Sequence, residues 1–163
     1  MTERSAFIAL GANLGDPASQ VARACLELDQ LPLTRLVQRS ALYRSRPVGY
    51  ADQPDFINAV AHVRTRLSPQ ALMGALLDIE SRHGRDRAFK NGPRTLDLDL
   101  LLIDDEVLHL PGLTLPHPRM SERPFVLVPL AEIAPEAAIP GHGRVADCLA
   151  GLATDGIARL SAD

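Results

Sequence analysis

Two aspartates, Asp97 and Asp99, interrupt the apolar run "LDLDLLL" at alternating positions. In a β-strand, residues two apart point to the same side, so the two carboxylates would lie side by side, with their Cα atoms roughly 6.5 to 7 Å apart. Like charges at this spacing repel each other, and a bound cation relieves the repulsion. Mg²⁺ prefers oxygen ligands and commonly bridges carboxylates to phosphates. The pair therefore suggests a site for a cation and a polyphosphate, and the alternative is an edge strand with two solvated aspartates.

A dense cationic block precedes the two aspartates. It contains Arg82, Arg85, Arg87, Lys90 and Arg94. Such a block is usually a solvated loop, but this one ends three residues before the carboxylates and must share their surface. Arginine binds phosphate oxygens in a forked geometry, so the combination suggests phosphoryl or pyrophosphoryl transfer by positioning and charge neutralisation. The segment "GANLGD" lacks the spacing and the lysine of a Walker A loop.

Aromatic and polar side chains elsewhere in the chain suit a flat, polar ligand. Phe56 next to Asn58 offers a ring surface beside an amide, which fits a heterocycle that needs stacking and hydrogen bonds at its edge. Downstream, His117 and Arg123 could add hydrogen-bond donors to a phosphate. The alternatives are that Phe56 belongs to the core and that His117 is structural.

Hydrophobic periodicity predicts the elements that position these residues. In chain order they are a strand at 5–11, a helix after Asp16 and Pro17, strands at 35–45 and 55–67, a helix from Ser68 to Gly84, and the aspartate strand. This β-α-β-β-α-β order is typical of an α+β, ferredoxin-like antiparallel sheet with helices on one face. Asn58, Asp97 and Asp99 would share the open face. The segment "RPFVLVPLAEIAP" is either a short helix or an extended run, and we expect an additional C-terminal helical layer.

Composition limits the class of protein. With 163 residues, 46% of them hydrophobic and 23% charged, we expect one domain over residues 1–163. A net charge of −3 argues against nucleic-acid binding. No apolar stretch reaches membrane-spanning length and the first residues do not resemble a leader, so we expect a cytoplasmic protein without a membrane partner. We also expect a monomer. Cys25 and Cys148 form no metal-binding motif and are expected to be reduced.

Five segments together carry a resemblance to a known family. These are "GANLGD", "YRSRPVGYADQPDFINA", "GPRTLDLDLLL", "LPHPRM" and "RPFVLVPLAEIAP". In the same order and spacing, over nearly the whole chain, they resemble the 6-hydroxymethyl-7,8-dihydropterin pyrophosphokinases of folate biosynthesis. The resemblance implies a ferredoxin-like fold, ATP as co-substrate and two Mg²⁺ ions. It also implies an enzyme that transfers the β,γ-pyrophosphoryl group to the pterin hydroxymethyl oxygen and releases AMP.

The same resemblance implies roles for individual residues. Asp97 and Asp99 would bind the metal ions and would be catalytic together with Arg85 and Arg94. The implied ATP-binding residues are Glu80, Arg85, Arg87, Arg94, His117 and Arg123. The implied pterin-binding residues are Ser45, Pro47, Val48, Phe56, Asn58 and Phe125, with the ring stacked between the two phenylalanines.

Two positions depart from the family pattern. Asn91 stands where several members carry a tryptophan, and Pro118 where some carry a tyrosine. These differences concern loop closure and the contact with adenine, not the metal site. The competing interpretation is a non-catalytic ferredoxin-like ligand-binding module in which the charged residues are simply surface.

Overall fold

The computed structural model describes residues 2–46, 53–84 and 96–160. The first seven elements are β1 (Arg4–Ala12), α1 (Pro17–Leu28), β2 (Thr34–Arg39), β3 (Tyr43–Ser45), β4 (Phe56–Thr65), α2 (Pro69–Arg82) and β5 (Asp97–Ile103). They are followed by β6 (Leu108–Leu110), β7 (Leu113–Leu115), a 3₁₀ turn (Met120–Glu122), α3 (Pro124–Ile133), β8 (Ala138–Ile139), β9 (Gly143–Arg144), α4 (Val145–Ala150) and β10 (Ile157–Arg159). None of the helices in these ranges is both long and apolar enough to span a membrane.

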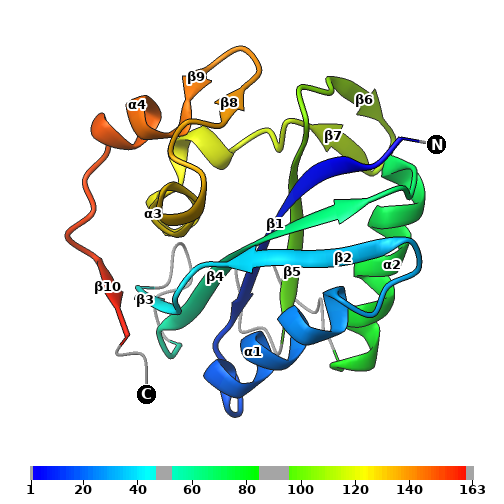
Figure 1. Ribbon diagram of the computed structural model, residues 1–163. Coiled ribbons are helices and arrows are strands. Elements are labelled where there is room, and N and C mark those ends of the chain that lie inside the picture. The colour runs from blue at the N-terminus through cyan, green and yellow to red at the C-terminus, as the bar shows by residue number, and fades with distance from the viewer. Residues whose placement is uncertain (1, 47–52, 85–95, 161–163) are drawn as a thin grey trace.

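The main sheet is antiparallel and has the strand order β10-β3-β4-β1-β5, with β2 also paired to β4 (Figure 1). The predicted mixed class with an antiparallel sheet is confirmed. The predicted strand at 35–45 is in fact two strands. Between them, the buried Ser40 uses its Oγ to accept from Val60 N at 2.9 Å and to donate to the carbonyl of Ala41 at 2.8 Å. Ser40 N still donates to the carbonyl of Val60 at 2.9 Å, but the Ser40 hydroxyl takes the Val60 N–H, so the regular ladder is interrupted between β2 and β3.

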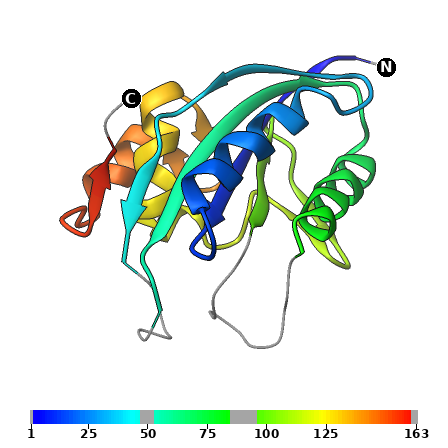
Figure 2. The ribbon, with the colours of Figure 1, turned by 90° about the horizontal axis from the view of Figure 1, so that it is seen from below.

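One face of the sheet packs against α1 and α2 (Figures 1 and 2). The strands contribute alternate residues to this core, including Ile8, Leu10, Ile57 and Leu98, as expected where side chains alternate between faces. Both helices begin at side-chain caps: Asp16 accepts from Ser19 N, and Ser68 accepts from Ala71 N. The predicted N-termini of both helices are therefore confirmed.

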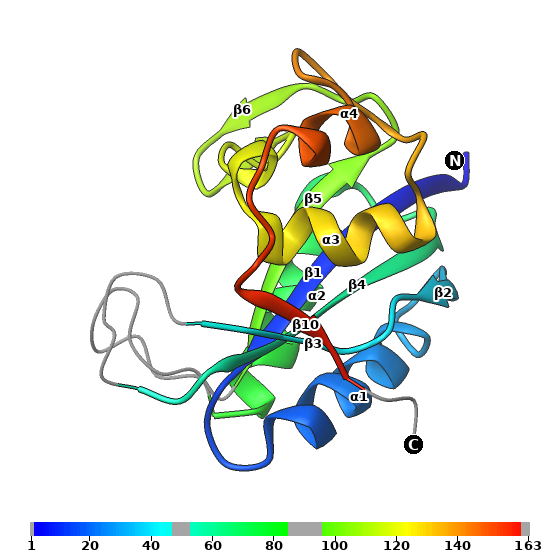
Figure 3. The same ribbon diagram turned by 90° about the vertical axis from the view of Figure 1, so that its left-hand side faces the viewer.

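The opposite face is covered in part by α3, with α4 beyond it (Figure 3). The ambiguous segment is a helix, and it packs on a second core that includes Phe7, Val60 and Leu101. A register shift between β1 and β5 at Phe7/Ile8 turns both Leu101 and Leu102 toward this core. This apolar surface would be costly to leave in water, which is why a helix lies over it.

A hydrogen-bonded glutamate joins α3 to the bend that follows β2. Glu132 accepts from Tyr43 Oη at 2.6 Å and from Ala41 N at 3.0 and 3.2 Å. Burial raises the pKa of the Tyr43 phenol to about 12, and the adjacent Glu132 carboxylate contributes in the same direction. The neutral phenol is therefore the stable donor to Glu132, and it fixes α3 against β3.

We predict that Tyr43→Phe lowers the free energy of unfolding by about 1 kcal/mol at neutral pH, because it removes one hydrogen bond. The wild type should also lose stability as the pH rises from about 10 to about 12, since an unfolded tyrosine releases its proton first. Chemical denaturation across this window should give a shallower decline for Tyr43→Phe. Parallel declines for the two proteins would contradict the role given to Tyr43.

Candidate active site

The predicted aspartates lie on the face of the sheet that α3 partly covers, near the start of β5. Asp97 pairs with Gly11, and Asp99 pairs with Ala9. Gly11 also pairs with Asn58 on β4, so Asn58, Gly11 and Asp97 form one row across three strands. The prediction that Asn58 and the aspartates share a face is confirmed by this register.

Gly11 is a site residue that the sequence analysis missed. A Cβ atom added there would lie 3.1 Å from Asn58 Nδ2, which is tighter than nine in ten Cβ contacts in proteins. Any other residue would therefore place a side chain between the amide of Asn58 and the carboxylate of Asp97. The signal was a glycine inside a strand, which often marks a close approach of another group.

Asn58 and Ser45 are hydrogen-bonded to each other between neighbouring strands. Ser45 Oγ donates to Asn58 Oδ1 at 2.5 Å, and both residues are buried. Phe56, two residues before Asn58, is half-buried at the start of β4 and is the pairing partner of Ser45. Three of the residues in the predicted pterin set thus lie together on β3 and β4.

Glu80, predicted to bind ATP, is only 2% exposed. Its Oε2 accepts from Leu98 N at 2.7 Å, so α2 is joined to β5 at the residue between the two aspartates. Because β5 ends the strand order among the described residues, the Leu98 amide has no described strand beyond it to bond with, and the glutamate provides the acceptor. The hydrogen bond from Leu98 N to Glu80 therefore positions the strand that carries the two aspartates.

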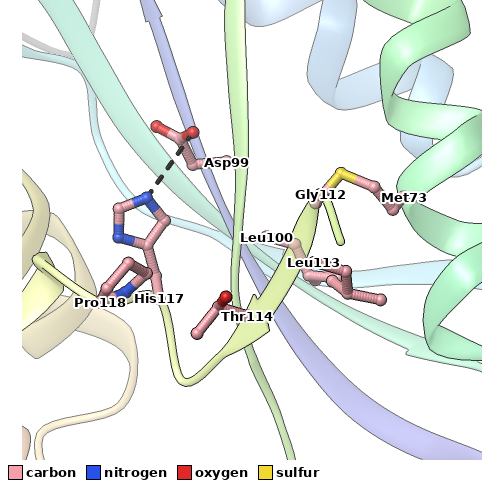
Figure 4. A pocket seen from close by; sticks show the side chains of 8 residues that line it. All are labelled: Met73, Asp99, Leu100, Gly112, Leu113, Thr114, His117 and Pro118. Atoms are coloured by element: carbon pink, nitrogen blue, oxygen red, sulfur yellow. Dashed lines mark ion pairs between the residues drawn. The ribbon is translucent and has the colours of Figure 1, made fainter. Parts of the chain in front are cut away.

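His117 follows β7 and faces Asp99 (Figure 4). Its backbone N donates to the carbonyl of Leu101 at 2.9 Å, and its Nε2 lies 3.9 Å from Asp99 Oδ1. The pKa of the imidazole is lowered to about 4, mainly by burial, with Arg123 acting in the same direction and Asp97 opposing it. His117 is consequently neutral at pH 7. Since its Nδ1 accepts from Arg119 N at 3.3 Å, the ring proton is on Nε2, toward Asp99.

A cavity of about 260 Å³ lies beside Asp99 and His117. Its other lining residues are Met73, Leu100, Gly112, Leu113, Thr114 and Pro118 (Figure 4). The cavity is thus apolar on the α2 and β7 side, with a carboxylate and an imidazole on the other. Such a combination suits a flat ring that carries a charged group at one end. Pro118, one of the two departures from the family pattern, is part of this lining.

Arg123 and Phe125 lie at the start of α3. The guanidinium carbon of Arg123 is 5.6 Å from the centre of the Phe125 ring, within the range of a cation–π contact. Phe125 packs at the border of the second core. The remaining predicted residues, Pro47, Val48, Arg85, Arg87 and Arg94, and the variable Asn91, lie outside the described residues.

Within the described ranges, no group of three or more His, Cys, Asp or Glu residues could hold a metal ion. Asp97 and Asp99, both half-buried on one face of β5, are the two carboxylates that a cation at this position would contact. Such a donor set does not resemble a closed protein cage. It fits Mg²⁺, which commonly takes one or two carboxylates and completes its shell with water and substrate phosphates.

Comparison with known proteins agrees with this geometry. The family model of 7,8-dihydro-6-hydroxymethylpterin-pyrophosphokinase (HPPK) matches residues 7–135. A 2-amino-4-hydroxy-6-hydroxymethyldihydropteridine pyrophosphokinase of Pseudomonas aeruginosa is 47% identical over 154 residues, covering 94% of this chain and 95% of the relative. The enzyme of the same name from Bacillus subtilis is 44% identical over 128 residues, 78% of this chain and 77% of the relative.

Solved structures agree in fold. The HPPK-DHPS protein of Plasmodium falciparum has a TM-score of 0.67 at 14% identity, over 91% of this chain and 41% of that chain. A structure of HPPK-DHPS in complex with substrates gives a TM-score of 0.69 at 14% identity, over 91% of this chain and 43% of that one. This chain thus spans less than half of those longer proteins. The protein has a mixed fold in which helices pack on an antiparallel sheet. It belongs to the 7,8-dihydro-6-hydroxymethylpterin-pyrophosphokinase family.

We predict that Glu80→Ala lowers the free energy of unfolding by about 1 to 3 kcal/mol, because it leaves Leu98 N–H buried without its acceptor. Glu80→Gln keeps a side-chain oxygen and should lose less. Asp78→Ala, on the exposed side of the same helix, is the control. Urea denaturation measures the loss of stability, and hydrogen exchange of the Leu98 amide measures the loss of its hydrogen bond. Equal losses of stability for Glu80→Ala and Asp78→Ala would refute the role of Glu80.

A second prediction concerns acid stability of the protein without ligands. The folded pKa of His117, about 4, is below its ordinary value of 6.5, so between these two values the unfolded chain binds more protons. The free energy of unfolding should therefore fall as the pH drops through this window. His117→Gln should flatten the decline, whereas the exposed His109→Gln should not. Urea titrations at several pH values test this, and an unchanged slope for His117→Gln would show the prediction to be wrong.

Proposed function

We propose that this chain transfers the β,γ-pyrophosphoryl group of ATP to the hydroxymethyl oxygen of 6-hydroxymethyl-7,8-dihydropterin and releases AMP, a step of folate biosynthesis. Family membership supports the reaction. The observation that carries the proposal for these residues is the row of Asn58, Gly11 and Asp97 across three strands. It brings a buried amide suited to a heterocycle next to a carboxylate suited to a phosphate-bound cation.

Asp97 and Asp99 would hold the magnesium, for which we propose two ions. The ions would neutralise charge on the β- and γ-phosphates. The contribution of the chain is to keep both carboxylates on one side of β5. Pairing with β1 and the bond from Glu80 to Leu98 N both serve this purpose.

ATP would enter the cavity beside Asp99 with its base toward Met73 and Leu113. There the neutral His117 would offer its Nε2–H as a donor to a phosphate, without adding a charge. Glu80 would act on the nucleotide mainly by positioning the strand. We further propose that Arg85, Arg87, Arg94 and Arg123 contact the phosphates, and that Arg85 and Arg94 assist catalysis.

The pterin would lie at the Asn58 end of the row. Asn58 would bond to the edge of the ring, while Phe56 and Phe125 would stack on its faces. Ser45, Pro47 and Val48 would complete the pocket. Because Gly11 places no side chain between Asn58 and Asp97, the hydroxymethyl arm could extend toward the phosphates at the carboxylates. Proximity of the two substrates is the main catalytic contribution expected of such a site.

We also propose that residues 1–163 form one pyrophosphokinase domain of ferredoxin-like topology, supported by the strand order β3-β4-β1-β5 with α1 and α2 on one face. The helices α3 and α4 would correspond to the additional C-terminal layer. A monomer in the cytoplasm remains our expectation.

The test is the identity of the nucleotide product. Incubated with ATP, Mg²⁺ and the pterin alcohol, the protein should form AMP, and chelation of the metal should stop the reaction. ADP would indicate an ordinary kinase, and absence of any product from folded protein would indicate the non-catalytic module.

We predict that Asp97→Asn and Asp99→Asn each reduce AMP formation by about 100-fold or more, since both remove a charge that binds the cation. The melting temperature should stay the same or rise slightly, because each substitution also removes a like-charge repulsion. Asp105→Asn, at an exposed position in the turn after β5, is the matched control and should leave turnover unchanged. Full activity in both site variants would contradict the assignment of the metal ligands.

A further inference from the structure

The last turn of α2 carries Glu80 and is followed by His83, whose side chain is only 4% exposed. The backbone N of His83 donates to the carbonyls of Ile79 and Glu80, at 3.1 Å each. The neighbouring Arg82 and Gly84 are both exposed, so the imidazole is buried between two residues that face solvent. A buried imidazole needs hydrogen-bond partners from elsewhere in the fold.

Both ring nitrogens of His83 are hydrogen-bonded to α1. Nδ1 is bonded to Oε1 of Gln20, and Nε2 donates to Oε1 of Glu27. The protonated ring donates to both oxygens. The neutral ring also keeps both bonds if the half-buried Gln20 amide turns by half a rotation, which costs only the bond from the exposed Arg23. The connection between the two helices therefore exists in either charge state of the ring.

The other contacts near this end of α2 are weaker. Ile79 is the last residue of the helix that belongs to the apolar core, and Arg82 is exposed. Arg82 pairs with Glu27 at 3.4 Å, but its side chain is 53% exposed, and exposed ion pairs contribute little. The last turn of a helix also frays readily, because its carbonyls lack partners along the helix. Among the described residues, the buried ring of His83 is therefore the main connection of this turn to α1.

The turn that His83 connects to α1 is the one that reaches the aspartate strand. Glu80 lies three residues before His83 and accepts from Leu98 N at 2.7 Å, between Asp97 and Asp99. Such a bond is lost when its N···O distance exceeds about 3.5 Å, so a small displacement of the last turn is enough to break it. The position of α2 against α1 thus bears on the backbone that carries both carboxylates.

We propose that His83 is a positioning residue for the reaction. It fixes the last turn of α2 against α1, so that Glu80 holds β5 at Leu98 and keeps the two aspartates in place. Coupling between separate elements travels through contiguous contacts, and here every step from α1 to β5 is a described hydrogen bond or a helical turn. The effect on the reaction rests on the proposed function.

The amide proton resonance of Leu98 tests the first part of this inference in the protein without ligands. Its chemical shift reports the bond to Glu80 in folded molecules, and Glu80→Ala gives the position of the resonance when the bond is absent. In His83→Ala the resonance should move from its wild-type position toward that in Glu80→Ala. His83→Gln places an N–H where Nε2 lies and should stay near the wild type. Arg82→Ala, which removes only the exposed ion pair, should not move it.

A double variant separates action through Glu80 from a direct effect of the imidazole ring. In the Glu80→Ala background, His83→Ala should leave the Leu98 resonance where it is, because the bond is already absent. If His83→Ala does not fold, His83→Asn takes its place. That variant keeps a group facing Gln20, loses the bond to Glu27, and should move the resonance in the same direction.

Steady-state kinetics tests the second part. His83→Ala should lower kcat for AMP formation by about 10-fold, because the aspartates are less well placed. The KM for the pterin alcohol should change by no more than about 2-fold, since the described residues of the predicted pterin set lie on β3, β4 and α3. In the Glu80→Ala background, His83→Ala should cause no further loss of kcat.

A Leu98 resonance that stays in its wild-type position in His83→Ala would overturn the inference, and so would an equal movement in the Glu80→Ala background. A displaced resonance with unchanged kcat would overturn the role in the reaction. A wild type that forms no AMP would overturn the proposed function instead, and the resonance comparison would still decide whether His83 positions β5.

Discussion

The pairing of β1 with β4 on one side and β5 on the other is the constraint on which the site depends. Gly11 is the shared partner, and through it Asn58 and Asp97 come into one row. Side chains alternate along a strand, so a slip of one residue in β5 would turn the aspartates toward α1 and α2 and expose leucines in their place. The buried Leu98 and Leu100 oppose such a slip. The core on one face thus fixes the chemistry on the other.

On the face of the sheet that α3 partly covers, one part packs against the helix and the other carries the polar residues of the candidate site. Because β4 and β5 both run antiparallel to β1, their starting ends lie together, and these ends carry Asn58 and the aspartates. Further along the same strands, Val60 and Leu101 belong to the core beneath α3. The helix therefore stabilises one part of the face, and the polar residues occupy the other. Glu132 extends this support to β3, and so to Ser45.

The charge state of His117 matters for the two aspartates beside it. Asp97 and Asp99 are the acidic pair, and the neighbouring His117 stays neutral because burial and Arg123 lower its pKa. A protonated imidazole 3.9 Å from Asp99 would attract the carboxylate that a cation requires. The neutral ring can still donate one hydrogen bond. A further carboxylate, that of Glu80, is buried between α2 and β5 and accepts a hydrogen bond from the backbone N of Leu98.

The sequence by itself determined the features that are local in the chain. Alternation placed Asn58, Asp97 and Asp99 on one face, and the residues Asp16 and Ser68 marked the starts of two helices. The tertiary structure alone decided the break at Ser40, the row through Gly11, and the bonds from Glu80 to Leu98 N and from Ser45 to Asn58. The physical reason is that alternation and capping act within a few residues, whereas these bonds join separate elements. Their partners are set by which strands and helices come together, and neither the spacing nor the type of a residue reveals that.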